Sequence, residues 1–272
     1  MRDKIKEYKI NGVTTIKKLI SEKLSKDIKK KINQIFSYQL IKEQIIKKEV
    51  DVIKNPRLFS LYKKKNTNSY NNTCLKIIQK IPEIYNFGTS QKMIKLVKSF
   101  GLKEPIFSTD PLIMINSKYS NSELGWQYAP LHQDWRSIQG SLNCLVVWIP
   151  LTTIDNLTGA IKYIKSSHLN GLQKTSEHKW FKEANYDKSK IELLKCRPKI
   201  NDAVFFSSFL LHKSEINKSK QVRISLQYRY NDLSEETFIT RDYPCNYKHA
   251  EPKKKLITKN FPKKKHLEKI FS

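Results

Sequence analysis

A histidine and an aspartate lie two residues apart in the segment APLHQDWRSIQGSLN, residues 129–143. The chain has only six histidines, and both His132 and Asp134 are residue types that bind divalent metals. In an extended strand, residues i and i+2 project from the same side, so both side chains could reach one ion while Gln133 faces away. A His-x-Asp tripeptide also arises often by chance, and taken alone it is better interpreted as a polar turn.

A third ligand is expected from His212, which ends the apolar run DAVFFSSFLLH. A buried strand of this sequence would carry the histidine to its end, although a lone histidine in this position is usually structural. The histidines at 178, 249 and 266 lie in lysine-rich, loop-like segments. Two imidazoles and one carboxylate on one face of a divalent ion form a triad that suits Fe(II) and leaves three coordination positions open.

An arginine and a serine, Arg223 and Ser225, would share one face of the next strand-like segment, QVRISLQYRY. A guanidinium binds a carboxylate through two parallel hydrogen bonds, and the hydroxyl adds another. We therefore expect this pair to bind a dicarboxylate cosubstrate. Each motif alone is weak, but the order His-x-Asp, then His212, then Arg-x-Ser in strand-like context makes chance coincidence far less plausible.

Short β-rich runs follow Pro105 and would position these residues. Polar turns or turns with Gly, Pro or Asn separate the runs. Because no long helix intervenes, the pattern predicts an antiparallel sandwich or barrel and not a βαβ fold. The runs are PIFSTDPLIMINS, WQYAPLHQD, LNCLVVWIPL, AIKYIK, AVFFSSFLL and VRISLQYRY.

The first hundred residues are predicted to be mainly helical. Apolar residues recur every three or four positions over 15–36, which is typical of an amphipathic helix, and a second helix is expected over about 37–51. The segment KKKNTNSYNNT, residues 63–73, predicts a polar loop. A further helix is expected from Ser90, as N-cap, to Phe100, with Gly101 at the C′ position.

The charge is strongly positive. The chain has 52 basic and 25 acidic residues and a formal charge of +27, which would attract nucleic acid, anionic lipid or a phosphorylated substrate. Only seven of the basic residues are arginine, and an excess of lysine, isoleucine and asparagine also indicates an A/T-rich coding sequence. Both interpretations remain open. The basic tail over 252–272 is expected to be loosely ordered.

Length and composition predict one globular domain over residues 1–272. The chain is 39% hydrophobic and 11% aromatic, enough for a core. Its longest apolar run, LNCLVVWIPL, is about half of a membrane span, and the N-terminus lacks the apolar region of a secretory signal. The four cysteines form no CxxC pair, so a reduced, cytoplasmic protein is expected.

Together these motifs resemble the phytanoyl-CoA dioxygenase (PhyH) family of non-haem iron, 2-oxoglutarate-dependent oxygenases. The resemblance covers most of residues 8–232. It departs at Ser166, where the family has a glycine before its Ser-His turn, and His168 of that turn is expected to be structural. The matching segments are YKINGVTTIKKLISEKLSKDIKKKI, LHQDW, TGAIKYIKSSHLNG, NDAVFFSSFLLHKSEINKS and RISLQYRY.

The resemblance implies a mainly β fold with flanking α-helices. Its core would be a double-stranded β-helix, a jelly-roll of the cupin-like kind, over residues 105–232. Residues 1–104 would form a mostly helical support that buttresses the larger sheet, and residues 233–272 a basic C-terminal extension.

The resemblance also implies the cofactors and the reaction: Fe(II), with 2-oxoglutarate and O₂ consumed and succinate and CO₂ released. Asp134 favours hydroxylation, since related halogenases lack this carboxylate. By position, His132, Asp134 and His212 match the catalytic iron ligands, Arg223 and Ser225 the residues that bind 2-oxoglutarate, Gln133 the family's middle residue, and Met114 and Trp148 the lining of the cosubstrate pocket.

The substrate is expected to be a small, anionic metabolite, such as an acyl thioester, a carboxylate or a sugar- or nucleotide-linked compound. Arg136 is the candidate contact, with Trp135 and Gln139 beside it, although Arg136 could equally be a surface residue. Alternatives are a non-catalytic, lysine-rich protein on the same fold that binds nucleic acid or anionic membrane, and a family member without turnover. The lysine clusters match no nucleic-acid motif, so no specific nucleic acid is expected.

Overall fold

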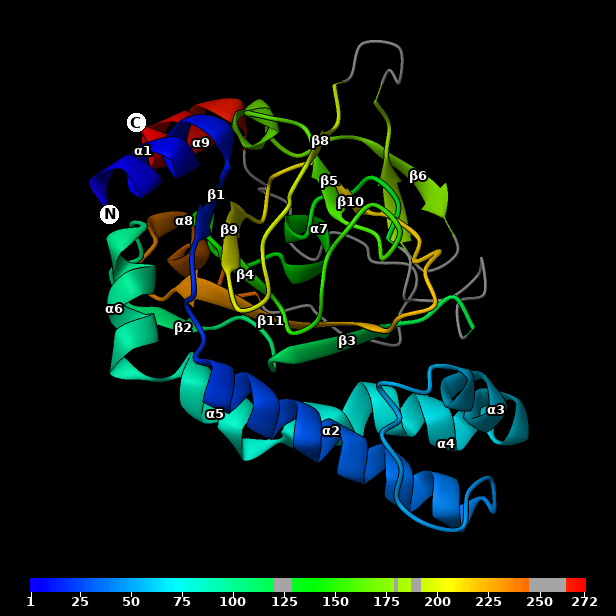
Figure 1. Cartoon of the computed structure of the whole chain (residues 1–272). Helices are drawn as coiled ribbons and strands as arrows, with labels where there is room; N and C mark the ends of the chain where they lie inside the picture. Colours follow the sequence, from blue (N-terminus) through cyan, green and yellow to red (C-terminus); the bar gives the residue numbers. More distant parts are fainter. Residues whose placement is uncertain (120–128, 179–180, 187–191, 245–262) are drawn as a thin grey trace.

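A computed structural model of the chain describes residues 1–119, 129–178, 181–186, 192–244 and 263–272 (Figure 1). Its largest element is an antiparallel sheet in the order β1-β9-β4-β11-β2, with β3 also paired to β11. These six strands are β1 (Val13–Ile16), β2 (Pro105–Phe107), β3 (Leu112–Asn116), β4 (Leu145–Pro150), β9 (Ala203–Ser207) and β11 (Arg223–Asp232).

Two smaller antiparallel sheets complete the β-structure. One has the order β10-β5-β8, and the other is the pair β6-β7. Ile161 of β5 packs in one apolar cluster with Trp148 and Phe206 of the large sheet, so the two sheets enclose an interior. The antiparallel sandwich predicted from the short apolar runs is therefore confirmed. The strands are β5 (Ile161–Tyr163), β6 (Thr175–His178), β7 (Phe181–Ala184), β8 (Leu194–Lys195) and β10 (His212–Ser214).

The central strand β11 has two faces of different character. Ile224, Leu226 and Tyr228 belong to the main hydrophobic core, which lies on the helical side of the sheet. Because side chains alternate along a strand, Arg223 and Arg229 project from the opposite face, toward the interior between the sheets. The alternation thus places polar groups in the interior without interrupting the core.

Helices cover the outer face of the large sheet, as the resemblance implied (Figure 1). The hydroxyl of Tyr228 donates to the carbonyl of Ile84 at 2.8 Å, and the hydroxyl of Tyr230 donates to that of Gly88 at 2.7 Å, which joins β11 to α5. The helices on this side are α2 (Glu22–Lys42), α3 (Arg57–Lys65), α4 (Thr67–Asn72), α5 (Pro82–Gly88) and α6 (Gln91–Ser99).

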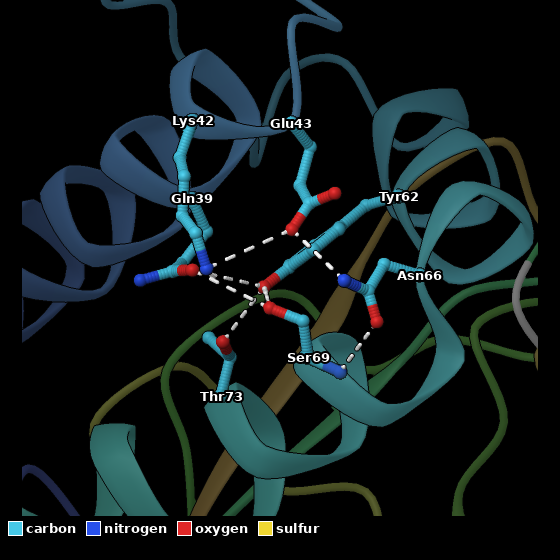
Figure 2. Close-up of polar contacts among 7 residues, drawn as sticks. All are labelled: Gln39, Lys42, Glu43, Tyr62, Asn66, Ser69 and Thr73. Atoms are coloured by element: carbon cyan, nitrogen blue, oxygen red, sulfur yellow. Dashed lines mark hydrogen bonds and ion pairs between the residues drawn. The ribbon is translucent and has the colours of Figure 1, made fainter.

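The polar loop predicted over 63–73 is wrong, because this segment is helical. It contains the end of α3, all of α4 and the start of a π-helical turn, η1 (Thr73–Ile77), which is followed by η2 (Ile78–Lys80). The buried hydroxyl of Tyr62 lies 2.8 Å from the hydroxyl of Ser69 and 2.9 Å from that of Thr73 (Figure 2). Asn66 accepts from the amide of Ser69 and donates to Glu43. The polar side chains of this segment therefore form hydrogen bonds within the helical region, which explains why a polar sequence is helical here.

The predicted helix over 15–36 begins later than expected. Residues 13–16 form β1 and pair with β9, since these consecutive β-branched residues favour an extended backbone. Ser21 then caps α2 through a bond from the amide of Leu24, and α2 runs unbroken to Lys42, so no separate helix occupies 37–51. The helix predicted from Ser90 is confirmed: its hydroxyl accepts from the amide of Met93.

The two ends of the chain lie together (Figure 1). Residues 264–271 of the tail, expected to be loosely ordered, instead form α9 (Lys264–Phe271), whereas 252–262 lie outside the described residues. The ring of Phe271 packs against that of Tyr8 on α1 (Arg2–Asn11). The centroid of the same ring lies 4.5 Å from that of His168 on η3 (Ser167–Asn170). Nε2 of His168 donates to the carbonyl of Lys9 at 3.0 Å, a structural contact. Within the described residues, no helix is long and apolar enough to cross a bilayer.

The burial of His168 predicts a loss of stability in mild acid. Burial lowers its pKa to about 4, below the ordinary histidine value of about 6.5. The unfolded chain therefore takes up the proton more readily, so this contribution is complete above about pH 6.5 and is lost as the pH falls toward 4. His168→Gln should remove about 2–3 kcal/mol of the pH dependence in this window. Urea unfolding of the wild type and the variant at about pH 4.5 and about pH 7.5 measures this difference in the free energy of unfolding. The same pH dependence in both proteins would contradict the prediction.

Candidate metal centre

Three residues that are far apart in the sequence converge in the interior. His132, Asp134 and His212 each offer one ligand atom, and these atoms all lie within 4.8 Å of one another. All three side chains are buried, and Nε2 of His132 lies 3.3 Å from Oδ1 of Asp134. The structure thus brings together the three residues that the sequence predicted as metal ligands.

The two histidines are joined through their backbones. The amide of His132 donates to the carbonyl of His212 at 2.9 Å, and the reverse bond is 3.0 Å. This isolated antiparallel bridge places the centroids of the two imidazole rings 4.3 Å apart. His212 begins β10 and does not end the preceding strand, since β9 stops at Ser207.

The backbone at Asp134 is not the extended strand that the spacing predicted. Its φ of −58° and ψ of −34° are helical, and it precedes the short helix α7 (Trp135–Ile138). Trp135 explains the turn: its ring is buried and stacks on Phe209 at 5.1 Å, and its amide donates to the carbonyl of Ser208. Asp134 therefore reaches the side of His132 through a turn and not through strand pleating.

Hydrogen bonds fix the tautomer of both histidines. Nδ1 of His132 lies 2.7 Å from the carbonyl of Pro130, and Nδ1 of His212 lies 2.9 Å from that of Leu210. A carbonyl only accepts, so each Nδ1 carries the proton and each Nε2 is the unprotonated nitrogen, the form that binds a metal. Burial, then the neighbouring His132, lowers the pKa of His212 to about 4, so this ring is neutral near pH 7. The donor set thus fits a divalent metal ion.

An arginine that the sequence did not single out contacts Asp134. Nε and Nη2 of Arg229 both lie 3.0 Å from Oδ2 of Asp134. Burial by itself would raise the pKa of Asp134, but the charge of Arg229 outweighs it and holds the pKa far below its ordinary range. The carboxylate is therefore ionised.

The residues expected to bind the cosubstrate lie along the interior face of the large sheet. Arg223 is buried, and its Nη1 donates to the carbonyls of Gly159 at 2.7 Å and Glu215 at 3.3 Å. Ser225 lies directly opposite Met114 on β3, and Trp148 of β4 lies opposite the next interior position of β11. These four residues share one surface, while Arg229 on the same strand contacts the triad.

The remaining candidates support the turn after His132. Gln133 faces away from the triad, as expected: its Nε2 donates to the carbonyls of Gly171 and Phe209. Arg136 is half-buried and donates to the carbonyl of Gln173 at 2.8 Å. Gln139 is buried and ends α7 with a positive φ of 54°. Roles in binding cosubstrate or substrate, Trp135 included, stay predictions for these residues.

Solved structures similar to the chain have low sequence identity to it, and they include non-haem enzymes. The epimerase SnoN, in complex with Fe³⁺, alpha ketoglutarate and nogalamycin RO, has a TM-score of 0.58 at 11% identity, covering 96% of this chain and 97% of SnoN. The alpha ketoglutarate-dependent carbocyclase SnoK has a TM-score of 0.52 at 15% identity, covering 93% and 94%. AviO1 from Streptomyces viridochromogenes Tue57 has a TM-score of 0.55 at 12% identity, covering 86% and 96%. These similarities confirm the jelly-roll fold with flanking helices.

Family membership follows from the sequence. No curated protein is similar enough to the chain to count as a match. The family model described as phytanoyl-CoA dioxygenase (PhyH) matches residues 8–225, which is most of the chain and includes both histidines, Asp134 and Arg223. The chain belongs to the phytanoyl-CoA dioxygenase family.

Proposed function

We propose that the protein is an Fe(II)- and 2-oxoglutarate-dependent dioxygenase that hydroxylates a small, anionic metabolite. The observation that carries this proposal is the buried group of His132, Asp134 and His212, with Nε2 of both histidines unprotonated and the carboxylate ionised. When bound there, iron would supply O₂ binding and activation at the expense of 2-oxoglutarate, which is converted to succinate and CO₂.

The chain's own residues would hold and orient the reactants. His132, Asp134 and His212 would bind Fe(II) through three positions and leave three open. Arg223, with Ser225, would bind the distal carboxylate of 2-oxoglutarate, and burial of the centre would exclude water. Asp134 favours hydroxylation over halogenation, because a halide would need the coordination position that this carboxylate takes.

The charges of the interior support an anionic substrate. Arg223 and Arg229 project from the same face of β11, and within the described part of the chain only Arg229 forms an ion pair with a carboxylate, that of Asp134. The two positive charges of Fe(II) would balance the two negative charges of the 2-oxoglutarate carboxylates, and the charge of Asp134 balances that of one arginine. One positive charge then remains in a buried site, which favours a substrate with a negatively charged group.

Anaerobic reconstitution with Fe(II) and 2-oxoglutarate, followed by exposure to air, tests the proposal. We expect succinate to form with members of a panel of carboxylates, acyl thioesters and sugar- or nucleotide-linked compounds, and not with neutral analogues. The product should be heavier than the substrate by one oxygen atom. Absence of succinate with every compound would contradict the reaction class. Succinate formation together with an epimerised or cyclised product would contradict hydroxylation but would leave the reaction class standing.

A further inference from the structure

The two oxygens of the Asp134 carboxylate have different surroundings. Oδ1 lies inside the triad, 3.3 Å from Nε2 of His132. Oδ2 accepts a hydrogen bond from Nε of Arg229 at 3.0 Å and lies 3.0 Å from Nη2 of the same guanidinium, as an ion pair. One oxygen therefore lies among the ligand atoms, and the other is bound by a guanidinium.

Arg229 is itself held in a fixed orientation. Its Nη2 also donates to Oε1 of Gln227, two residues earlier on the same face of β11, at 3.0 Å. The side chain is buried, and β11 is fixed between β4 on one edge and β2 and β3 on the other. A guanidinium on a central strand and bound by its own neighbour is a rigid partner for a carboxylate.

We propose that Arg229 is a positioning residue for the metal centre: by binding Oδ2, it reserves Oδ1 as the single donor oxygen of Asp134. The proposal rests on the proposed function. A carboxylate that can rotate can offer both oxygens to one ion and thereby fill an additional position. Arg229 prevents this, and so keeps three positions open for the cosubstrate, O₂ or water.

Arg223 provides a matched control. It is the same residue type on the same face of the same strand, and it is equally buried, but its guanidinium donates to the carbonyls of Gly159 and Glu215 and not to Asp134. Arg223→Met and Arg229→Met therefore each remove one buried guanidinium. Only the second removes a contact with a metal ligand.

The test is titration of the metal-free protein with Co(II), without 2-oxoglutarate, followed by visible absorption. We expect Arg229→Met to raise the Co(II) dissociation constant about 10- to 100-fold, because an unrestrained carboxylate must be ordered on binding. It should also change the shape of the Co(II) spectrum, which reports coordination number. Arg223→Met should retain the affinity and spectrum of the wild type. Arg229→Lys keeps the charge with fewer donors and should recover both in part.

The spectrum separates positioning from a general loss of stability, and circular dichroism identifies variants that fold. A folded Arg229→Met protein with wild-type affinity and spectrum would overturn the proposal and leave the metal centre intact. Equal changes in Arg223→Met and Arg229→Met would also overturn it. If Arg229→Met does not fold, Arg229→Lys decides in the same way. A wild-type protein that binds no Co(II) would overturn the metal centre itself.

Discussion

Asp134→Ala is expected to lower the affinity for Fe(II) by more than about 100-fold and to abolish formation of succinate. The change removes the only anionic ligand of the triad and leaves the charge of Arg229 next to the ion. Loss of a group that merely orients a ligand costs about 10- to 100-fold, so loss of the ligand itself should cost more. Metal titration under anaerobic conditions and a succinate assay measure the two effects.

The same substitution should also destabilise the fold. Removing one partner of a buried ion pair costs about 3–5 kcal/mol, because the other charge stays buried without compensation. Asp27→Ala is the control, since Asp27 is exposed on α2, and it should change neither metal affinity nor stability. Wild-type iron affinity in a folded Asp134→Ala protein would contradict the assigned centre.

Arg223→Met is expected to weaken 2-oxoglutarate binding about 100-fold while the metal stays bound. Loss of two charge-assisted hydrogen bonds to a carboxylate costs about 3 kcal/mol, which corresponds to this change in dissociation constant. Titration of the Fe(II)-loaded protein with 2-oxoglutarate in the absence of O₂ measures it. Because the guanidinium also binds two backbone carbonyls, Arg223→Lys is a milder variant with an intermediate expected effect.

The matched control for this prediction is Arg197→Met, because Arg197 is exposed. It should leave the affinity for 2-oxoglutarate unchanged. If Arg223→Met bound 2-oxoglutarate as tightly as the wild type, the distal carboxylate would have to be bound by another residue. Arg229 on the same strand face would then be the next candidate to test.

The sequence predicted the triad well because its motifs are local or follow a fixed order along the chain. It predicted the local structure of Asp134 less well. The spacing of His132 and Asp134 suits a strand, yet the buried ring of Trp135 on Phe209 turns the chain into α7. A contact with a residue that lies 74 positions further along the chain decides this conformation, and no local pattern contains it.

Arg229 was missed for a related reason. It lies 95 residues from Asp134 in the sequence, and a chain with 52 basic residues offers many possible partners for any carboxylate. Two signals were nevertheless available. Arginine is rare here, and Arg229 is six residues after Arg223, an even spacing that places both on one face of a strand. Similarly, only the pairing of β1 with β9 explains why residues 13–16 leave the helical pattern.

The backbone bridge between His132 and His212 has a consequence for biosynthesis. The bridge closes a loop of about 80 residues, and bringing the ends of such a loop together costs roughly 4 kcal/mol of chain entropy. A nascent chain that has left the ribosome only as far as residue 200 contains His132 and Asp134 but lacks their partner. The three ligand residues therefore come together only after His212 has been synthesised and has paired with His132, so a metal bound at this centre would be bound late.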